Sequence, residues 1–204
     1  MAATECSMRF LWLAGLLMFI AGTPCWGQTP AHEDSGHGWD FGFWFAGATG
    51  EQHTNSFAEA QILAAGLSAG RVITDEIGHG WRRGRIEYAF GVTPRFAQIR
   101  PKNTYGVGFE PIVLRWKSGL HAFRLQPYIE LAGGGLHTST NFPSGNTSDF
   151  NFTARVGGGF QVFARDQAAM DIGCRWLHIS NANLGTQNPE FNGVQIVFGY
   201  RWHR

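Results

Sequence analysis

Apolar and polar residues alternate along much of this chain, and the alternation predicts β-strands. The clearest stretch is residues 83–96, where one face is mostly aromatic and aliphatic and the other is mostly charged or small. Residues 122–136, 150–163 and 194–203 repeat this period of two. Weaker versions of the pattern occupy four further segments, residues 39–49, 60–73, 106–117 and 168–180. Because side chains on a strand alternate between two faces, the chain is predicted to form eight strands.

The connections between these segments predict how the strands are arranged. Two connections are tight turns, at residues 117–119 and 165–167, although the one at residues 74–81 is longer. The others are long and rich in Asn, Ser, Thr, Gly and Pro, at residues 50–59, 97–105, 138–149 and 181–191. Short periplasmic turns and longer extracellular loops are typical of outer-membrane barrels. We therefore predict an all-β fold, an eight-stranded antiparallel transmembrane β-barrel over residues 39–204.

The two faces of the predicted strands differ in a way that sets their expected orientation. The polar faces carry charges of both signs, at Arg85, Glu87, Arg95, Arg124, Glu130, Arg155 and Arg201. An eight-stranded barrel has a narrow interior filled by side chains, where opposite charges can pair. We therefore expect the polar faces inside and the apolar faces toward lipid. The alternative is a soluble, lipocalin-like barrel that packs its apolar faces inward.

Composition agrees with a membrane barrel and disfavours other classes. Charged residues make up 15% of the chain, below the roughly 25% of ordinary soluble domains, whereas aromatic residues make up 14%. The formal net charge of +1 gives no basic surface for nucleic acid. The mean hydropathy of −0.15 argues against a helical membrane protein.

The first 27 residues are predicted to be a cleaved secretory signal peptide. Arg9 precedes an apolar run over residues 10–21, and Cys25 and Gly27 stand at positions −3 and −1 of a cleavage site. A lipid anchor on Cys25 is disfavoured because Pro24 precedes it. Residues 28–38 are polar and are expected to form a flexible N-terminal arm. The exported chain then keeps Cys174 alone, so it has no internal disulfide.

Candidate chemistry lies at the end of the segment 168–180. His178 and Ser180 share a face with apolar residues such as Trp176, and they are separated by about 6.6 Å along a strand. At this spacing the imidazole can bend to the hydroxyl and act as its base. The strand is expected to run outward, so the pair would face the outer leaflet, where a nucleophile is costly unless it acts on lipid. A polar pair that merely ends a strand is the plain alternative.

The last two strands also carry a recognisable motif, His178-Ile179-Ser180-Asn181-Ala182 followed by Asn188-Pro189. This motif resembles that of the PagL-type lipid A 3-O-deacylases, eight-stranded outer-membrane barrels that remove the ester-linked acyl chain at position 3 of lipid A. The resemblance implies Ser180 as nucleophile and His178 as general base. It also implies that donors around Asn181, Asn183 and Asn188 hold the oxyanion.

The motif departs from the family at one position. The family has a Glu twelve residues after the serine, and this chain has Asn192 there. An asparagine oxygen can accept the Nδ1–H of His178 but cannot stabilise the imidazolium by charge, and losing a triad acid can reduce the rate about 10⁴-fold. Glu190 has the same strand parity and is the other candidate to orient His178. Trp176, Ile196 and Phe198 are expected to contact the acyl chain.

These features predict an outer-membrane esterase that acts on lipid A and needs no metal or other cofactor. The partners implied are lipopolysaccharide and the outer membrane, with a homodimer as a further option and no nucleic acid. Two other functions stay open at this point. One is a non-catalytic barrel for adhesion or membrane stability that has lost the triad acid, and the other is a secreted soluble lipid-binding barrel.

Overall fold

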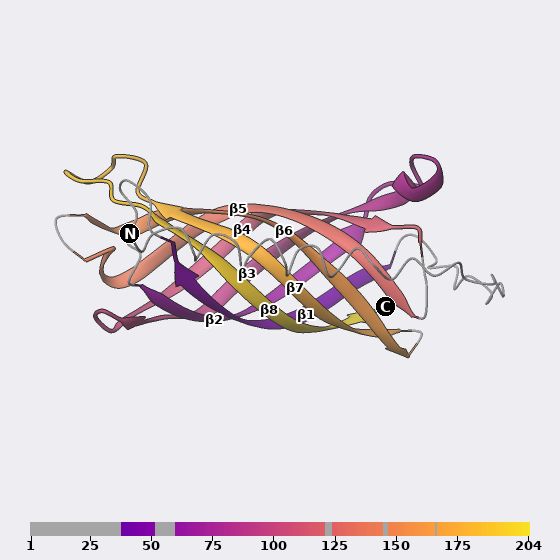
Figure 1. The fold of residues 1–204 in the computed structure, drawn as a ribbon, viewed down its shortest axis with the longest axis horizontal. Helices are drawn as coiled ribbons and strands as arrows, with labels where there is room; N and C mark the ends of the chain where they lie inside the picture. The colour runs from indigo at the N-terminus through magenta and orange to yellow at the C-terminus, as the bar shows by residue number, and fades with distance from the viewer. Residues whose placement is uncertain (1–37, 52–59, 121–123, 145–146, 166) are drawn as a thin grey trace, which may run out of the picture. The chain divides into compact units, whose positions relative to one another are not determined.

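A computed structural model describes residues 38–51, 60–120, 124–144, 147–165 and 167–204. The expected signal peptide and residues 28–37 of the expected arm lie outside these ranges. The described residues form eight strands: β1 (Trp39–Gly50), β2 (Gln61–Val72), β3 (Gly84–Arg100), β4 (Thr104–Ser118), β5 (Leu125–Phe142), β6 (Ser148–Arg165), β7 (Ala168–Ser180) and β8 (Phe191–His203). Each strand pairs antiparallel with its neighbours in sequence, and β1 pairs with β8 (Figure 1), which confirms the predicted closed barrel. Among these residues no helix has the length and apolar character needed to cross a bilayer.

The apolar faces of the strands point outward. Large apolar side chains are exposed on the outside of the barrel, including Phe45 at 59%, Phe198 at 57% and Ile129 at 57%. Their polar neighbours in sequence are buried inside, among them Glu87, Glu130, Arg155 and Arg201. This orientation is the one that the alternation predicts for a membrane barrel. It is the reverse of the lipocalin-like alternative.

Ion pairs between distant strands fill the interior. Arg115 of β4 contacts Glu130 of β5 at 2.6 Å and Asp171 of β7 at 3.1 Å. Lys117 of β4 and Arg201 of β8 both contact Glu87 of β3, at 2.7 and 2.9 Å. We call this set the charged network; its other members are Asp40, Glu110, Arg155, Arg175 and His203. Buried charges are tolerated only when they are paired. The pairing in this network explains how the interior of the barrel can hold the charges that the sequence places there.

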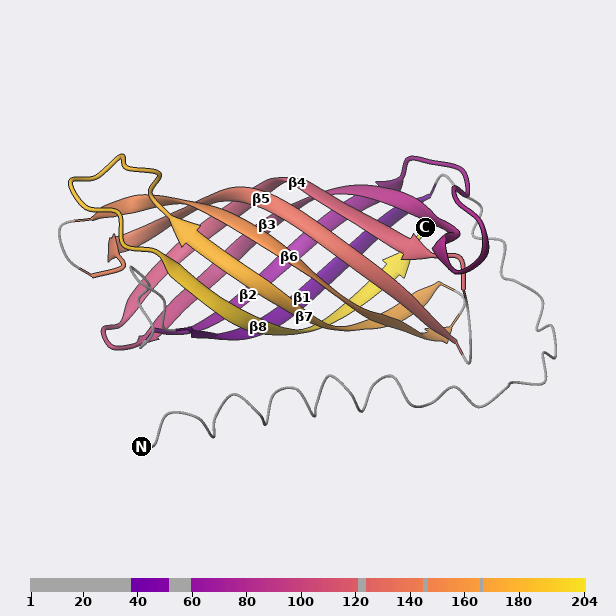
Figure 2. The ribbon, with the colours of Figure 1, turned by 45° about the horizontal axis from the view of Figure 1, so that its top comes forward.

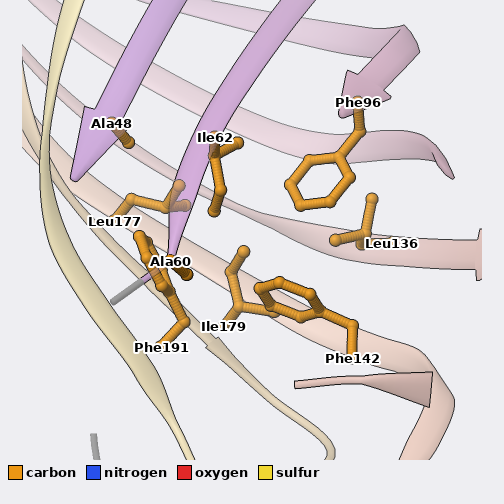
Figure 3. Close-up of a cluster of buried hydrophobic side chains, with 9 residues drawn as sticks. All are labelled: Ala48, Ala60, Ile62, Phe96, Leu136, Phe142, Leu177, Ile179 and Phe191. Carbon is orange, nitrogen blue, oxygen red and sulfur yellow. The ribbon is translucent and has the colours of Figure 1, made fainter. Parts of the chain in front are cut away.

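A second interior cluster is entirely apolar. We call it the outer plug, and it consists of Ala48, Ala60, Ile62, Phe96, Leu136, Phe142, Leu177, Ile179 and Phe191 (Figure 3). The phenyl rings of Phe96 and Phe142 meet edge-on with centroids 5.5 Å apart, and Phe142 also contacts Phe191. The sequence had indicated an outward position for Phe96 and an inward one for Arg95, and both were wrong. A register irregularity between Thr93 and Phe96 shifts the strand phase, so Phe96 is buried and Arg95 is exposed.

Some connections differ from those expected. β3, β5 and β6 contain 17, 18 and 18 residues, more than the about 9–11 that a tilted strand needs to cross a membrane. Most of the expected loops at residues 97–105 and 138–149 is therefore strand, and β3 and β4 are joined only by residues 101–103. Arg124, expected on an interior face, instead lies exposed in the turn before β5 with a left-handed φ of 64°.

The two ends of the barrel are also not distinguished by loop length alone. The β2–β3 connection, residues 73–83, is long and lies at the end that holds Trp39 and Arg204, which we call the terminal end. Residues 181–190 join β7 to β8 at the opposite end, which we call the loop end (Figure 2). The outer plug lies next to this connection, because Ile179 and Phe191 flank it.

Candidate active site

Strand β7 presents two different faces at its last residues. Leu177 and Ile179 point inward and pack in the outer plug, at 5% and 1% exposure. Trp176, His178 and Ser180 alternate with them and therefore point outward. The plug thus anchors the backbone from inside while the polar side chains stand on the outer wall.

Neighbouring strands flank the polar side chains of β7. On one side, Phe152 and Ala154 of β6 pair with Ser180 and His178. On the other side, Asn192 of β8 pairs with His178. The site is therefore built on three adjacent strands held in one ladder, which is a rigid support for side-chain geometry.

His178 links Ser180 to Asn192. Its Nε2 lies 2.9 Å from the Ser180 Oγ, and its Nδ1 lies 2.8 Å from the Asn192 Oδ1. A carbonyl oxygen can only accept a hydrogen bond, so Nδ1 carries the imidazole proton and Nε2 is free to accept from the serine hydroxyl. This is the geometry of a serine with its base and an orienting group.

Glu190 is hydrogen-bonded to Asn192 and not to the imidazole. Its Oε2 accepts a hydrogen bond from the Asn192 Nδ2 at 3.2 Å. Of the two residues that the sequence left as candidates to orient His178, Asn192 is the one within hydrogen-bond distance, and Glu190 stands one step behind it. Ser180 and Asn192 are 9% and 7% exposed and are largely shielded, whereas His178 and Glu190 are half-buried.

The connection after Ser180 is ordered by its asparagines. The Asn181 backbone N–H donates to the Asn188 Oδ1 at 3.0 Å, and the Asn181 side chain donates to the Gln187 carbonyl at 2.8 Å. The Asn183 N–H donates to the Asn181 Oδ1 at 3.0 Å. Two of the backbone donors expected near the oxyanion therefore already have partners within the connection. The side-chain amide of Asn188 is held beside Asn181 by its oxygen, which leaves its nitrogen as a donor.

An apolar surface adjoins the polar side chains on the outer wall. Trp176, Ile196 and Phe198 are 40%, 46% and 57% exposed on β7 and β8. The Trp176 ring stacks on the imidazole of His178, with ring centroids 5.6 Å apart and planes inclined by 18°. All three residues expected to contact an acyl chain thus lie on the same outward surface as Ser180. Among the residues that the structure describes, no group of three or more His, Cys, Asp and Glu side chains could hold a metal ion.

Sequence reasoning missed two contacts of this site. The stacking of Trp176 on His178 and the hydrogen bond between Asn192 and Glu190 both join residues two apart on one strand face. That spacing was visible in the sequence as a shared parity. What the spacing does not give is the rotamer of each side chain, which decides whether neighbours on a face touch.

Together, the closed eight-stranded barrel and its outward apolar faces define a class, a barrel of the outer-membrane type, and the outer wall of this barrel carries a hydrogen-bonded Ser–His–Asn line. The family model described as "Lipid A 3-O-deacylase (PagL)" matches residues 22–201. The chain therefore belongs to the PagL lipid A 3-O-deacylase family.

Solved structures support the same fold. The crystal structure of the outer-membrane enzyme PagL is 19% identical, with a TM-score of 0.60 over 78% of this chain and 97% of that one. The crystal structure of Neisserial surface protein A (NspA) is 16% identical, with a TM-score of 0.55 over 82% of this chain and 96% of that one. At these identities the likeness concerns the barrel. A comparison with curated protein sequences found no match.

Proposed function

We propose that this protein is an outer-membrane esterase that hydrolyses the 3-O-linked acyl chain of lipid A. The observation that carries the proposal is the 2.9 Å contact between His178 and Ser180 on the outward wall at the loop end. A serine and its base on a lipid-facing surface are positioned for an ester within the bilayer rather than for a soluble substrate. Membership of the deacylase family supports the same substrate.

The proposed reaction is a two-step acyl transfer. The Ser180 Oγ attacks the ester carbonyl carbon while the His178 Nε2 takes its proton. The tetrahedral intermediate collapses as His178 returns that proton to the 3-oxygen of the sugar, which leaves with its bonding electrons. Water, deprotonated by His178, then attacks the acyl-serine; the bond between the acyl carbon and the Ser180 Oγ breaks, His178 returns the proton to Oγ, and the fatty acid leaves.

The oxyanion needs donors beside Ser180. The Asn188 side chain fits this role, because its oxygen is occupied by the Asn181 N–H and its nitrogen carries two N–H groups. The backbone of residues 181–183 lies in the same connection, where Ala182 and Asn183 have left-handed φ values of 49° and 64°. Donors fixed in advance stabilise developing charge without reorganisation.

The acyl chain is proposed to lie against Trp176, Ile196 and Phe198. These side chains face the region that lipid occupies around a membrane barrel, so the chain reaches the site without leaving the bilayer. Polar groups at the loop end would then meet the sugar, and apolar groups on the wall would meet the hydrocarbon.

Mass spectrometry of lipid A tests the proposal. Expression of the wild-type chain in a Gram-negative host that lacks such activity is expected to remove one hydroxyacyl chain from lipid A. Ser180→Ala is expected to abolish the loss, and Ser144→Ala, an exposed serine of the β5–β6 connection, is expected to retain it. Unchanged lipid A with folded wild-type barrel in the outer membrane would favour the non-catalytic alternative. Persistent loss in Ser180→Ala would remove Ser180 as nucleophile.

A further inference from the structure

Four side chains form an unbroken hydrogen-bonded line on the outer wall. Ser180 meets His178 at 2.9 Å, His178 meets Asn192 at 2.8 Å, and Asn192 meets Glu190 at 3.2 Å. Asn192, which lies between His178 and Glu190, is a neutral amide. The two ends of an amide differ, one being an oxygen and the other a nitrogen, whereas both ends of a carboxylate are oxygens.

Asn192 can present either end of its amide to His178. With the oxygen toward Nδ1, as in the structure, Nδ1 keeps its proton and Nε2 can accept the proton of Ser180. With the nitrogen toward Nδ1, the amide would donate to Nδ1 and the imidazole proton would move to Nε2. His178 could then no longer act as a base for Ser180. The two orientations have nearly the same shape, so packing alone does not choose between them.

Glu190 favours the first of these orientations. A carboxylate has no N–H or O–H to give, so it can accept from the Asn192 nitrogen but cannot pair with the Asn192 oxygen. The contact at 3.2 Å therefore favours the orientation in which the amide oxygen faces His178. Because Asn192 is 7% exposed, water competes little for its nitrogen. The same carboxylate places negative charge two hydrogen bonds from the imidazolium that forms during the reaction.

The fold fixes Glu190 and Asn192 relative to each other. Phe191 lies between them on the opposite face of the strand and is fully buried in the outer plug (Figure 3). Asn192 is paired with His178 in the β7–β8 ladder. With Phe191 anchored inside, Glu190 and Asn192 must both stand on the outer wall beside His178.

We propose that Glu190 is a positioning residue for the serine–histidine pair. It fixes the amide of Asn192 and, through it, the productive tautomer of His178, so that the work of one triad carboxylate is divided between Asn192 and Glu190. The catalytic consequence rests on the proposed esterase function, whereas the tautomer of His178 can be measured without it.

The tautomer is read from the ¹⁵N chemical shifts of His178 in the full chain folded in detergent micelles. The wild type is expected to show the proton on Nδ1 alone. Glu190→Gln, which can donate as well as accept, is expected to give a mixture with the Nε2–H form. Asp149→Asn removes an exposed charge at the same end of the barrel and is expected to leave the spectrum unchanged. A wild-type spectrum in Glu190→Gln would overturn the proposal.

Kinetics on lipid A in mixed micelles test the proposal by the direction in which Glu190→Gln changes kcat in two backgrounds. In the wild-type background, Glu190→Gln is expected to lower kcat about tenfold and leave KM within about twofold. In the Asn192→Asp background, the aspartate accepts from Nδ1 directly, so Glu190→Gln is expected to raise kcat by relieving repulsion between two carboxylates. A decrease in both backgrounds would mark Glu190 as merely structural. Inactive wild type with the expected spectra would count against the esterase function alone.

Discussion

The indole ring of Trp176 lies flat against the imidazole of His178, with centroids 5.6 Å apart. His178 thus receives two kinds of constraint, hydrogen bonds at its ring nitrogens and stacking on its face. Trp176→Ala is expected to lower kcat/KM about tenfold, because the imidazole gains freedom and the acyl chain loses an aromatic contact. The kcat/KM of Trp176→Phe is expected to lie between those of the wild type and Trp176→Ala. Initial rates on lipid A micelles provide the measurement.

Trp202→Ala is the matched control for this change. Trp202 is 41% exposed on the outer wall, as Trp176 is at 40%, but it belongs to the terminal end of β8. The loss of an outward tryptophan there is expected to leave kcat/KM unchanged. Equal losses in the two variants would mean that Trp176 acts through general lipid anchoring and has no special effect on His178.

The orientation of the strands was predictable because it follows from period-two alternation and charge. Glu87 and Arg201 alternate with apolar residues, and a charge of either sign can be buried only where it finds a partner. Loop boundaries were less predictable. Residues 138–142 are polar enough to suggest a loop, yet they continue β5, in which Thr138 pairs with Gly106 of β4 and Phe142 pairs with Ser148 of β6. The displaced phase at Phe96 depends on a local irregularity that leaves no period-two signal.

The candidate site was also predictable only in part from the sequence. Strand parity placed His178, Ser180 and Asn192 on one face, since residues on one face of a sheet need only the correct count along each strand. The pairing of His178 with Asn192 depends on the register between β7 and β8, which the sequence alone does not give. The order Glu190–Asn192–His178 depends further on side-chain rotamers, so two residues that looked like alternatives in the sequence lie in series in the structure.

The outer plug is expected to support the site as well as the fold. Phe191 and Phe142 are both fully buried in it, with ring centroids 6.2 Å apart. Phe191→Ala and Phe142→Ala are each expected to lower the free energy of unfolding by about 3–5 kcal/mol, because each leaves a cavity. Only Phe191 lies between Glu190 and Asn192, so only Phe191→Ala is expected to reduce kcat under conditions where both variants are folded.

Urea unfolding in lipid vesicles followed by tryptophan fluorescence gives the stabilities, and lipid A hydrolysis gives kcat. Phe198→Ala removes a phenyl ring from the outer wall, where the side chain is 57% exposed, and should destabilise the barrel much less. If Phe142→Ala reduced kcat as much as Phe191→Ala, the plug would act on the site as a whole rather than through the segment that carries Glu190 and Asn192.

Glu130 is expected to be essential to the stability of the charged network. Glu130 accepts from Arg115 at 2.6 Å and from Arg175 at 2.8 Å, and all three side chains are at least nine-tenths buried. Glu130→Gln removes the negative charge between two buried guanidinium groups, and it is expected to lower the free energy of unfolding by about 3–5 kcal/mol. Glu76→Gln breaks an ion pair of the same length with Arg83 at an exposed site, where the expected loss is about 0–1 kcal/mol. Urea unfolding of both variants decides the matter, because a loss for Glu130→Gln as small as that for Glu76→Gln would mean that water reaches the network and screens its charges.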